Sequence, residues 1–136
     1  MLLAGLYDGS MVLVDISEMK VIDSVTAQRD QILQIIFSKV FILIWIYFQS
    51  LQTVVTIGVD TSVNLWSIQG SKLHYKKSFD TSIGHNKFAA LSMDGTSLFC
   101  RFDSKGIQQW SIESGEKLCV IDLQYYPYSI LNTGAI

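Results

Sequence analysis

The chain has 136 residues, of which 49% are hydrophobic and 16% are charged, and its formal net charge is −2. This composition excludes the polar, charge-rich class of disordered chains, and the length allows one domain with a sizeable core. The sequence contains no basic stripe that would neutralise phosphates, so we expect no nucleic-acid partner.

The cysteines and the N-terminus bear on the cellular compartment. Cys100 and Cys119 have no CxxC spacing and fall in apolar runs, so we expect two reduced, buried thiols. The first ten residues lack the basic region and the long apolar run of a signal peptide. Together these features predict a cytoplasmic protein, with the nucleus as the alternative location.

Short apolar runs alternate with turn residues along the chain, beginning with the two runs that flank Asp8-Gly9. An Asp-Gly pair between apolar runs is a strong hairpin signal, because both central residues of such turns favour positive φ. No convincing helical period is present. The expected strands span residues 1–6, 11–16, 21–25, 31–38, 51–58, 62–68, 72–79, 87–92, 97–102, 107–112, 117–123 and 128–131. This pattern predicts an all-β sandwich, barrel or propeller.

A long-range repeat decides among these folds. The run SVNLWSI at 62–68 reappears as GIQQWSI at 106–112, and a weaker copy, MVLVDI, stands at 11–16. Trp66 and Trp110 are 110 − 66 = 44 residues apart. Four-stranded propeller blades repeat every 40 to 45 residues, roughly, so the spacing favours a propeller.

These repeats resemble the WD-repeat β-propeller family in a degenerate form. The residues that carry the resemblance are 88–95, Asp103 and Trp110-Ser111 in the last repeat, 32–38, Asp60 and Trp66-Ser67 in the middle repeat, and Asp8 and Val14-Asp15 in a partial first copy. The resemblance implies an incomplete β-propeller of about two full four-stranded antiparallel blades plus a partial first blade. The blades would span residues 1–29 (partial), 30–83 and 84–126, and the tail 127–136 would begin a further blade.

The family also implies structural roles for particular side chains. Its Trp often belongs to a buried hydrogen-bonded set with a hydroxyl residue, an Asp and a loop His. In the middle repeat the expected His position falls near Gln28, and in the last repeat Cys100 replaces the hydroxyl residue and the Asp is displaced by one. The positions to which we assign such structural roles are Asp8, Val14, Thr56, Asp60, Trp66, His85, Asp94, Asp103 and Trp110.

The repeat also reveals ten additional residues. The distance from Leu91 to Trp110 is 19 residues, whereas the matching distance from Phe37 to Trp66 is 29. Deleting residues 40–49, VFILIWIYFQ, restores the register with the last repeat. These residues occupy a turn that should be polar and exposed. The exposed apolar side chains expected there are Phe41, Ile42, Leu43, Ile44, Trp45, Ile46, Tyr47 and Phe48.

Three interpretations of this insertion compete. The first is an extension of the hairpin by further β-structure. The second is a membrane element, although the apolar run 40–48 is far shorter than the roughly 20 residues that a spanning helix needs. The third is translation of a short retained intron, because the segment restores the register when deleted and has the wrong chemistry for a turn.

The sequence lacks catalytic motifs. It contains no phosphate-binding Gly-rich loop before a helix, no GxSxG, no HExxH and no metal-ligand cluster. We therefore expect no enzyme activity and no catalytic, cofactor-binding or metal-binding residues.

The resemblance implies a non-catalytic scaffold for protein–protein interactions, with other proteins as partners. Closed propellers have roughly four to eight blades, so we also expect self-association or completion by further blades. Two alternatives remain. One is a membrane-associated protein anchored through residues 40–48, and the other is a truncated or mis-spliced product without independent function.

Overall fold

The computed structural model describes residues 1–39, 52–60, 62–79, 88–92, 94–101 and 106–123. These residues form β-strands and no helix. The strands are β1 (Leu2–Gly5), β2 (Ser10–Asp15), β3 (Lys20–Thr26), β4 (Ile32–Lys39), β5 (Gln52–Gly58), β6 (Val63–Gln69), β7 (Lys72–Phe79), β8 (Phe88–Leu91), β9 (Ser97–Arg101), β10 (Gly106–Ser111) and β11 (Lys117–Asp122). The prediction of an all-β fold is confirmed.

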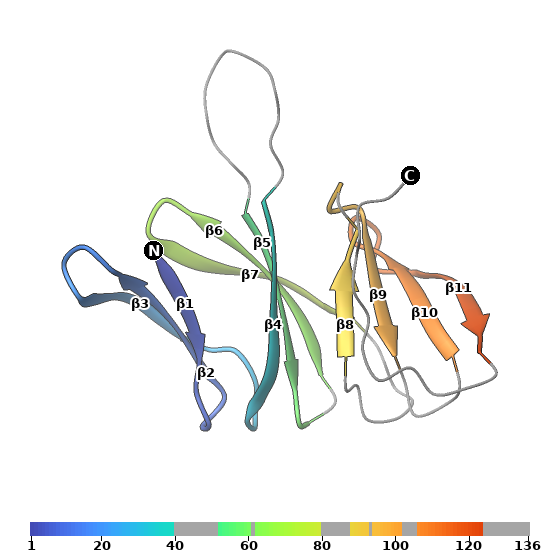
Figure 1. Cartoon of the computed structure of the whole chain (residues 1–136), viewed down its shortest axis with the longest axis horizontal. Coiled ribbons are helices and arrows are strands. Elements are labelled where there is room, and N and C mark those ends of the chain that lie inside the picture. The colour runs from blue at the N-terminus through green and yellow to red at the C-terminus, as the bar shows by residue number, and fades with distance from the viewer. Residues whose placement is uncertain (40–51, 61, 80–87, 93, 102–105, 124–136) are drawn as a thin grey trace, which may run out of the picture.

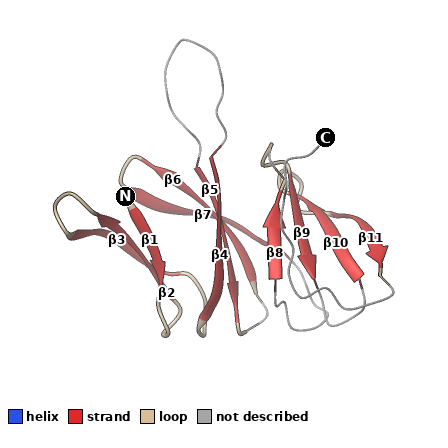
Figure 2. Ribbon diagram, in the orientation of Figure 1, coloured by secondary structure: helices blue, strands red, loops and turns tan. Residues whose placement is uncertain are grey.

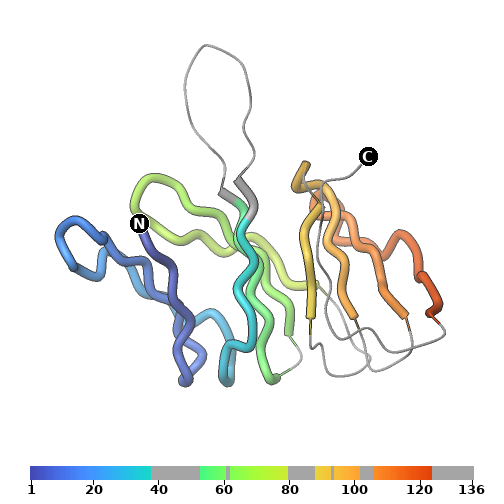
Figure 3. The backbone as a smooth tube through the Cα atoms, viewed as in Figure 1, coloured from blue at the N-terminus to red at the C-terminus, as the bar shows by residue number. Residues whose placement is uncertain are grey.

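The strands form three antiparallel sheets that follow one another in chain order (Figure 1). The first sheet has the order β1-β2-β3, the second β4-β5-β6-β7 and the third β8-β9-β10-β11. Figure 2 shows strands joined by turns among the described residues, and in Figure 3 the backbone runs from blue to red one sheet at a time. Sequential units of this kind are typical of repeat proteins, in which each unit contacts only its neighbours.

Two hydrophobic cores lie between these sheets. The core between the first and second sheets contains Met11, Leu13, Ala27, Val54, Trp66, Ile68 and Leu73. The core between the second and third sheets contains Val55, Ile57, Val63, Leu65, Phe79, Ala89, Leu91, Leu98, Cys100 and Trp110. The second sheet is therefore covered on both faces, which explains why five of the seven residues of β6 are buried.

Polar contacts also join neighbouring sheets. The side chain of Gln34 on β4 donates to Ala89 O at 3.2 Å and accepts from Ala89 N at 3.0 Å, so one amide group binds both backbone groups of a residue on β8. Between the first and second sheets, Leu73 N on β7 donates to Asp23 Oδ2 on β3 at 2.7 Å. These bonds fix the sheets relative to one another beyond what the apolar packing does.

The Asp-Gly turns differ from the sequence expectation in one respect. Gly9 and Gly95 have positive φ, 81° and 70°, but the only described non-glycine residue with positive φ is Met19, at 51°. Asp8 instead accepts a hydrogen bond from Ser10 N at 2.9 Å through Oδ1. The expectation that both central residues take positive φ is therefore wrong for these turns, because the aspartate stabilises the turn through its side chain.

The connection between β4 and β5 is longer than its counterpart in the third sheet. Phe37 pairs with Val54, a separation of 54 − 37 = 17, whereas Leu91 pairs with Leu98, a separation of 98 − 91 = 7. The difference is ten residues. The predicted insertion at 40–49, with its apolar side chains Phe41 to Phe48, lies outside the described residues, as does the predicted strand at 128–131. The blade boundaries remain predictions.

The two cysteines lie in different environments. Cys100 is fully buried, as expected, but Cys119 is exposed. The expectation of a buried Cys119 is wrong because β11 is the last strand of the third sheet, and all six of its residues are exposed.

Candidate functional site

A chain of buried polar groups lies at the boundary between the first and second sheets. Trp66 Nε1 donates a hydrogen bond to Thr56 Oγ1 at 3.1 Å, and Gln28 Nε2 donates to the same oxygen at 2.8 Å. Thr56 is fully buried, Gln28 is 3% exposed and Trp66 is 6% exposed. Gln28 belongs to the segment between β3 and β4, which links the first two sheets. These hydrogen bonds therefore connect that linker to the centre of the second sheet.

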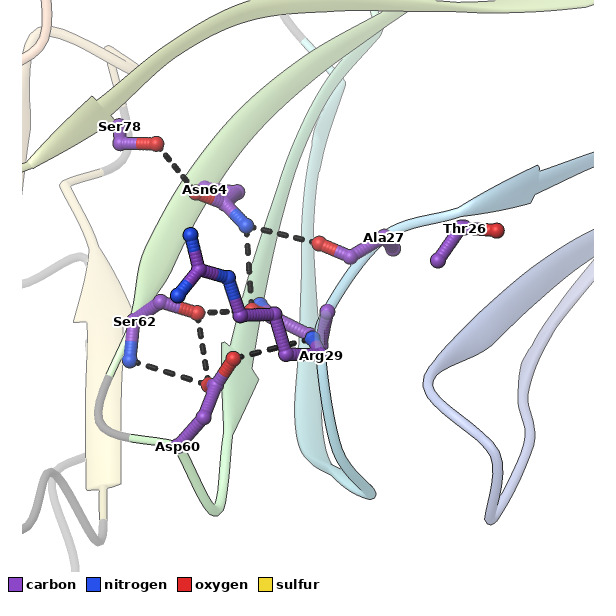
Figure 4. A pocket seen from close by; sticks show the side chains of 8 residues that line it. Thr26, Ala27, Arg29, Asp60, Ser62, Asn64 and Ser78 are labelled. Atoms are coloured by element: carbon purple, nitrogen blue, oxygen red, sulfur yellow. Dashed lines mark hydrogen bonds between the residues drawn. The ribbon is translucent and has the colours of Figure 1, made fainter.

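The oxygen end of the Gln28 amide is also bonded. Gln28 Oε1 accepts from Asn64 Nδ2 at 3.1 Å and, in a shorter contact, from Ser62 Oγ. Asn64 Nδ2 donates in addition to Ala27 O at 2.7 Å, and Ser78 Oγ donates to Asn64 Oδ1 at 2.6 Å. Figure 4 shows these groups converging on the linker from β6 and β7. Both ends of the buried amide are therefore satisfied, which removes the cost of burying it.

Asp60 holds the outer part of this cluster. Its Oδ1 accepts from Ser62 Oγ at 2.7 Å and from Ser62 N at 3.2 Å, and its Oδ2 accepts from Arg29 N at 3.0 Å. Ser62 has a single hydroxyl hydrogen, so at any moment it donates either to Asp60 or to Gln28.

The same contacts set the ionisation of Asp60. Partial burial raises the pKa of its carboxyl group, but the hydrogen bonds from Ser62 and from the Arg29 backbone outweigh burial, and the pKa lies below its usual value of 3.8. A lowered pKa means that the carboxylate stabilises the fold above pH 3.8, and that this contribution is lost as the pH falls through the lowered value.

The cluster lines an open pocket of about 390 Å³, formed by Thr26, Ala27, Gln28, Arg29, Asp60, Ser62, Asn64 and Ser78. Among the described residues that line this pocket, Asp60 is the only acidic side chain, and its lowered pKa makes it a weak base near neutral pH. The other polar groups mostly bond one another. The arrangement of the described residues is suited to holding the linker and the β5–β6 turn together.

Gly58 leaves room for this cluster. A Cβ atom at Gly58 would lie 2.3 Å from Asp60 Oδ1 and 3.1 Å from Gln28 Cδ. No side chain can occupy that position unless Asp60 moves away from Ser62 and Arg29. The glycine is therefore needed here for space.

The third sheet has the same strand register, but the residue at the position of Thr56 has no hydroxyl group. Thr56 pairs with Asn64 and Val54 with Trp66, while Cys100 pairs with Gln108 and Leu98 with Trp110, so Cys100 stands where Thr56 does. Trp110 is 7% exposed, and its Nε1 is a buried donor without a partner among the described residues. Burial raises the pKa of the Cys100 thiol to about 12, so this sulfur stays protonated.

We predict that Cys100→Thr raises the free energy of unfolding by about 1 kcal/mol, because the new hydroxyl oxygen can accept from the unpaired indole N–H of Trp110. Urea denaturation of Cys100→Thr beside Cys100→Val checks this, since valine supplies similar bulk without an acceptor. Equal stabilities of the two variants would contradict the assignment.

The first sheet lacks both members of the pair. Ala4 pairs with Val12 and Val14 with Leu2, so Ala4 and Val14 occupy the positions of Thr56 and Trp66. The first sheet therefore has neither a hydroxyl oxygen nor an indole N–H at these two positions. Asp8, the counterpart of Asp60, bonds only within its own turn in the described structure, and the hydrogen bonds from Ser10 lower its pKa.

The structure thus places the sequence-predicted residues in different settings. Thr56, Asp60 and Trp66 meet in one cluster, while Asp94 lies in the β8–β9 turn, where it accepts from Thr96 N at 3.0 Å. His85 and Asp103 lie outside the described residues.

The central residue of the cluster, Gln28, was absent from the predicted positions, and so were Ser62 and Asn64. The available signal for Gln28 was its place near the histidine position that the WD-repeat resemblance implies. A glutamine can replace that histidine because its amide, like a neutral imidazole, offers both a donor and an acceptor.

The described residues contain no group of three or more His, Cys, Asp or Glu side chains that could hold a metal ion. Nor does the described part of the chain include a helix that is long and apolar enough to cross a membrane.

Comparisons with known proteins support the architecture. No protein-family model and no curated protein sequence matches the chain. Among solved structures, the chain is similar to the β-propeller domain of Cps50 (Swd1) from Myceliophteria thermophila, with a TM-score of 0.74 and 12% sequence identity. The match covers 88% of this chain and 37% of that chain. The fold is that of an incomplete β-propeller, and this chain spans little more than a third of the domain that it resembles.

Proposed function

We propose that this chain is a non-catalytic protein-interaction module, one part of a β-propeller that binds other proteins through its turns. The observation that carries this proposal is the hydrogen-bonded set of turns at one end of the sheets, which we call the lower rim. It comprises the described residues 6–9, 27–31, 59–60 and 62.

The three segments of the lower rim hold one another in place. Gly9 O accepts from Ala27 N at 2.9 Å and from Gln28 N at 3.0 Å, and Val59 N donates to Gln31 O at 2.9 Å. The hydrogen-bonded cluster of Gln28, Thr56 and Asp60 joins two of these turns to the second sheet. A binding surface that is already rigid loses little conformational entropy when a partner binds.

The lower rim also exposes side chains that are suited to contacts with proteins. Tyr7 is 81% exposed, Leu6 43% and Val59 40%, and Arg29 is also exposed. Figure 4 shows the Arg29 side chain extending from the linker towards Ser62 and Asn64. Tyr and Arg are enriched among the residues that dominate interface energies, so we assign Tyr7 and Arg29 as the main contacts.

Affinity purification from cell extract tests this proposal. Proteins retained by the native chain should be lost with the double variant Tyr7→Ala/Arg29→Ala, whose melting temperature should stay unchanged because both side chains are exposed. The matched control is Lys117→Ala/Leu118→Ala, which removes a cation and an apolar side chain from the exposed strand β11. Retention that survives the rim variant, or that the control variant abolishes equally, would contradict a role for the lower rim.

A further inference from the structure

The pocket at the lower rim has two charged side chains among its described lining residues, Arg29 and Asp60. Both carboxylate oxygens of Asp60 accept hydrogen bonds, which come from Ser62 and from the Arg29 backbone. The guanidinium group of Arg29 forms no hydrogen bond or ion pair with any residue that the structure describes. The pocket therefore holds one charge whose hydrogen-bonding capacity is used and one whose capacity is free.

Asp60 does not occupy the guanidinium group. Burial raises the pKa of Asp60, and among the causes that lower it, the hydrogen bonds from Ser62 and from Arg29 N exceed the charge of Arg29. The two side chains therefore interact only at longer range. Figure 4 shows that the Arg29 side chain points across the pocket towards Asn64. Since Arg29 is exposed, the N–H donors of its planar fork are open to a ligand.

Most other polar groups of the pocket are occupied. Asn64 Nδ2 uses both of its hydrogens, for Ala27 O and for Gln28 Oε1. Ser78 Oγ donates to Asn64 Oδ1, and Gln28 Nε2 donates to Thr56 Oγ1. A ligand that enters from solvent thus meets groups that are already bonded and one free cation among the described lining residues. It gains most if it offers a pair of acceptors to that cation.

The neighbouring carboxylates of the lower rim are engaged in their own turns. Asp8 Oδ1 accepts from Ser10 N at 2.9 Å, and Asp30 Oδ1 accepts from Gln31 N at 2.7 Å. Neither Asp8 nor Asp30 lines the pocket. The described lining residues thus carry one positive and one negative charge, so a ligand with one negative charge meets less repulsion than a ligand with two.

We propose that Arg29 binds the side-chain carboxylate of a glutamate or an aspartate on a partner protein. Arginine pairs with a carboxylate through two parallel N–H···O bonds, so it selects the geometry of the group as well as its charge. This assignment rests on the proposed function and names the chemistry of the partner at the lower rim. A phosphate is the weaker ligand, because its second negative charge meets Asp60 in the same pocket.

The probe is the N-acetyl N-methylamide of glutamate, a single residue without terminal charges. NMR of the isotope-labelled full chain follows the Nε–H signal of Arg29 and the side-chain amide signal of Asn64. Both signals should shift saturably, with a dissociation constant in the millimolar range that suits one ion pair with few other contacts. The matching glutamine derivative has the same shape without the charge, and it should bind several-fold more weakly.

Two further probes identify the source of the carboxylate. N-acetylglycine carries a chain-terminal carboxylate, which cannot reach as far into the pocket, so it should bind more weakly than the glutamate derivative. The corresponding phosphoserine derivative should bind no more tightly than the glutamate derivative.

Two substitutions of Arg29 separate recognition from a loss of structure. Arg29→Gln removes the charge and should abolish saturable binding, whereas Arg29→Lys keeps the charge without the planar fork and should weaken binding several-fold. Both variants should retain the native melting temperature, because the side chain is exposed. The matched control, Lys76→Gln, removes an exposed cation from β7 and should leave binding unchanged. In every variant the side-chain amide of Asn64 reports binding.

Several results would overturn the proposal. They are the absence of saturation, equal binding of the glutamine derivative, equal binding to Arg29→Gln, and tighter binding of N-acetylglycine or of the phosphoserine derivative. Binding that appears only in the variant Asp80→Asn/Asp103→Asn would show that this chain's own carboxylates, outside the described residues, occupy Arg29. An Asn64 signal that shifts when the chain alone is diluted would show that a second copy does so.

The carboxylate site and the proposed function can fail separately. Tyr7→Ala should not affect binding of the glutamate derivative, because Tyr7 does not line the pocket. If Tyr7→Ala/Arg29→Ala loses the retained proteins but the native chain does not bind the derivative, the proposed function stands and the carboxylate site is rejected. If the derivative binds but retention of proteins is independent of the lower rim, the proposed function is rejected and the carboxylate site stands.

Discussion

Replacing Thr56 by valine is expected to lower the free energy of unfolding by about 2 to 4 kcal/mol. The substitution preserves the shape of the side chain but removes the oxygen that accepts hydrogen bonds from both Trp66 and Gln28. Both donors would stay buried without a partner, at a cost of roughly 1 to 3 kcal/mol each. Typical domains have a total stability of about 5 to 15 kcal/mol, so this single oxygen has a large effect.

Urea denaturation followed by tryptophan fluorescence measures this loss. The control is Thr56→Ser, which keeps the hydroxyl group and loses only a methyl group. We expect the serine variant to retain most of the native stability. Valine and serine variants of equal stability would show that the hydrogen bonds to Thr56 do not stabilise the fold.

The second large effect is expected from Gly58→Ala, which should cost about 1 to 3 kcal/mol, the range of overpacked sites. A Cβ atom 2.3 Å from Asp60 Oδ1 forces the carboxylate away from Ser62 and from the Arg29 backbone. The lower rim should then loosen as well, because Asp60 connects the β5–β6 turn to the linker.

A double-mutant cycle separates this clash from a general effect of the alanine. Asp60→Ala removes the oxygen atoms that the new Cβ would meet, so Gly58→Ala should cost less in that background than in the native chain. The coupling energy should be well outside the few tenths of a kcal/mol that independent sites show, roughly 0.5 or less. Additive losses would contradict the steric explanation.

Local features of the sequence were enough to predict the strands. β5, for example, spans Gln52–Gly58 where a strand over residues 51–58 is expected, because turn residues follow an apolar, β-prone run. The interval between Trp66 and Trp110 predicted the repeat, since equal spacing reflects units of equal construction. Comparing the spacings of the two repeats also revealed the excess length between Phe37 and Trp66.

The partners of individual side chains could not be predicted in this way. Gln28 bonds Thr56 across 28 residues of sequence, and its role depends on how the linker enters the second sheet. The resemblance indicated where to look, but a glutamine at a histidine position left the role undecided. Cys100 illustrates the opposite case, because the substitution seen in the sequence coincides with a buried indole N–H, that of Trp110, which lacks a partner among the described residues.

Exposure was the least predictable property. Phe37 and Leu91 occupy matching positions in their strands, yet one is half exposed and the other is buried. The difference in exposure arises in the neighbouring sheets. β8 lies against β4, whereas the first sheet has no described strand at the position that matches β4. The sequences of β4 and β8 themselves do not contain this information. Cys119 was misjudged for a similar reason, because its burial depended on what covers the last strand of the third sheet.

Hydrogen exchange at the indole N–H of Trp66, followed by NMR, tests most directly whether the buried chain of Gln28, Thr56 and Trp66 locks the linker onto the second sheet. We predict slow exchange in the native protein, because the N–H group is buried and bonded to Thr56 Oγ1. We also predict faster exchange in both Thr56→Val and Gln28→Ala. Fast exchange in the native protein, or no acceleration in the two variants, would contradict this role for the cluster.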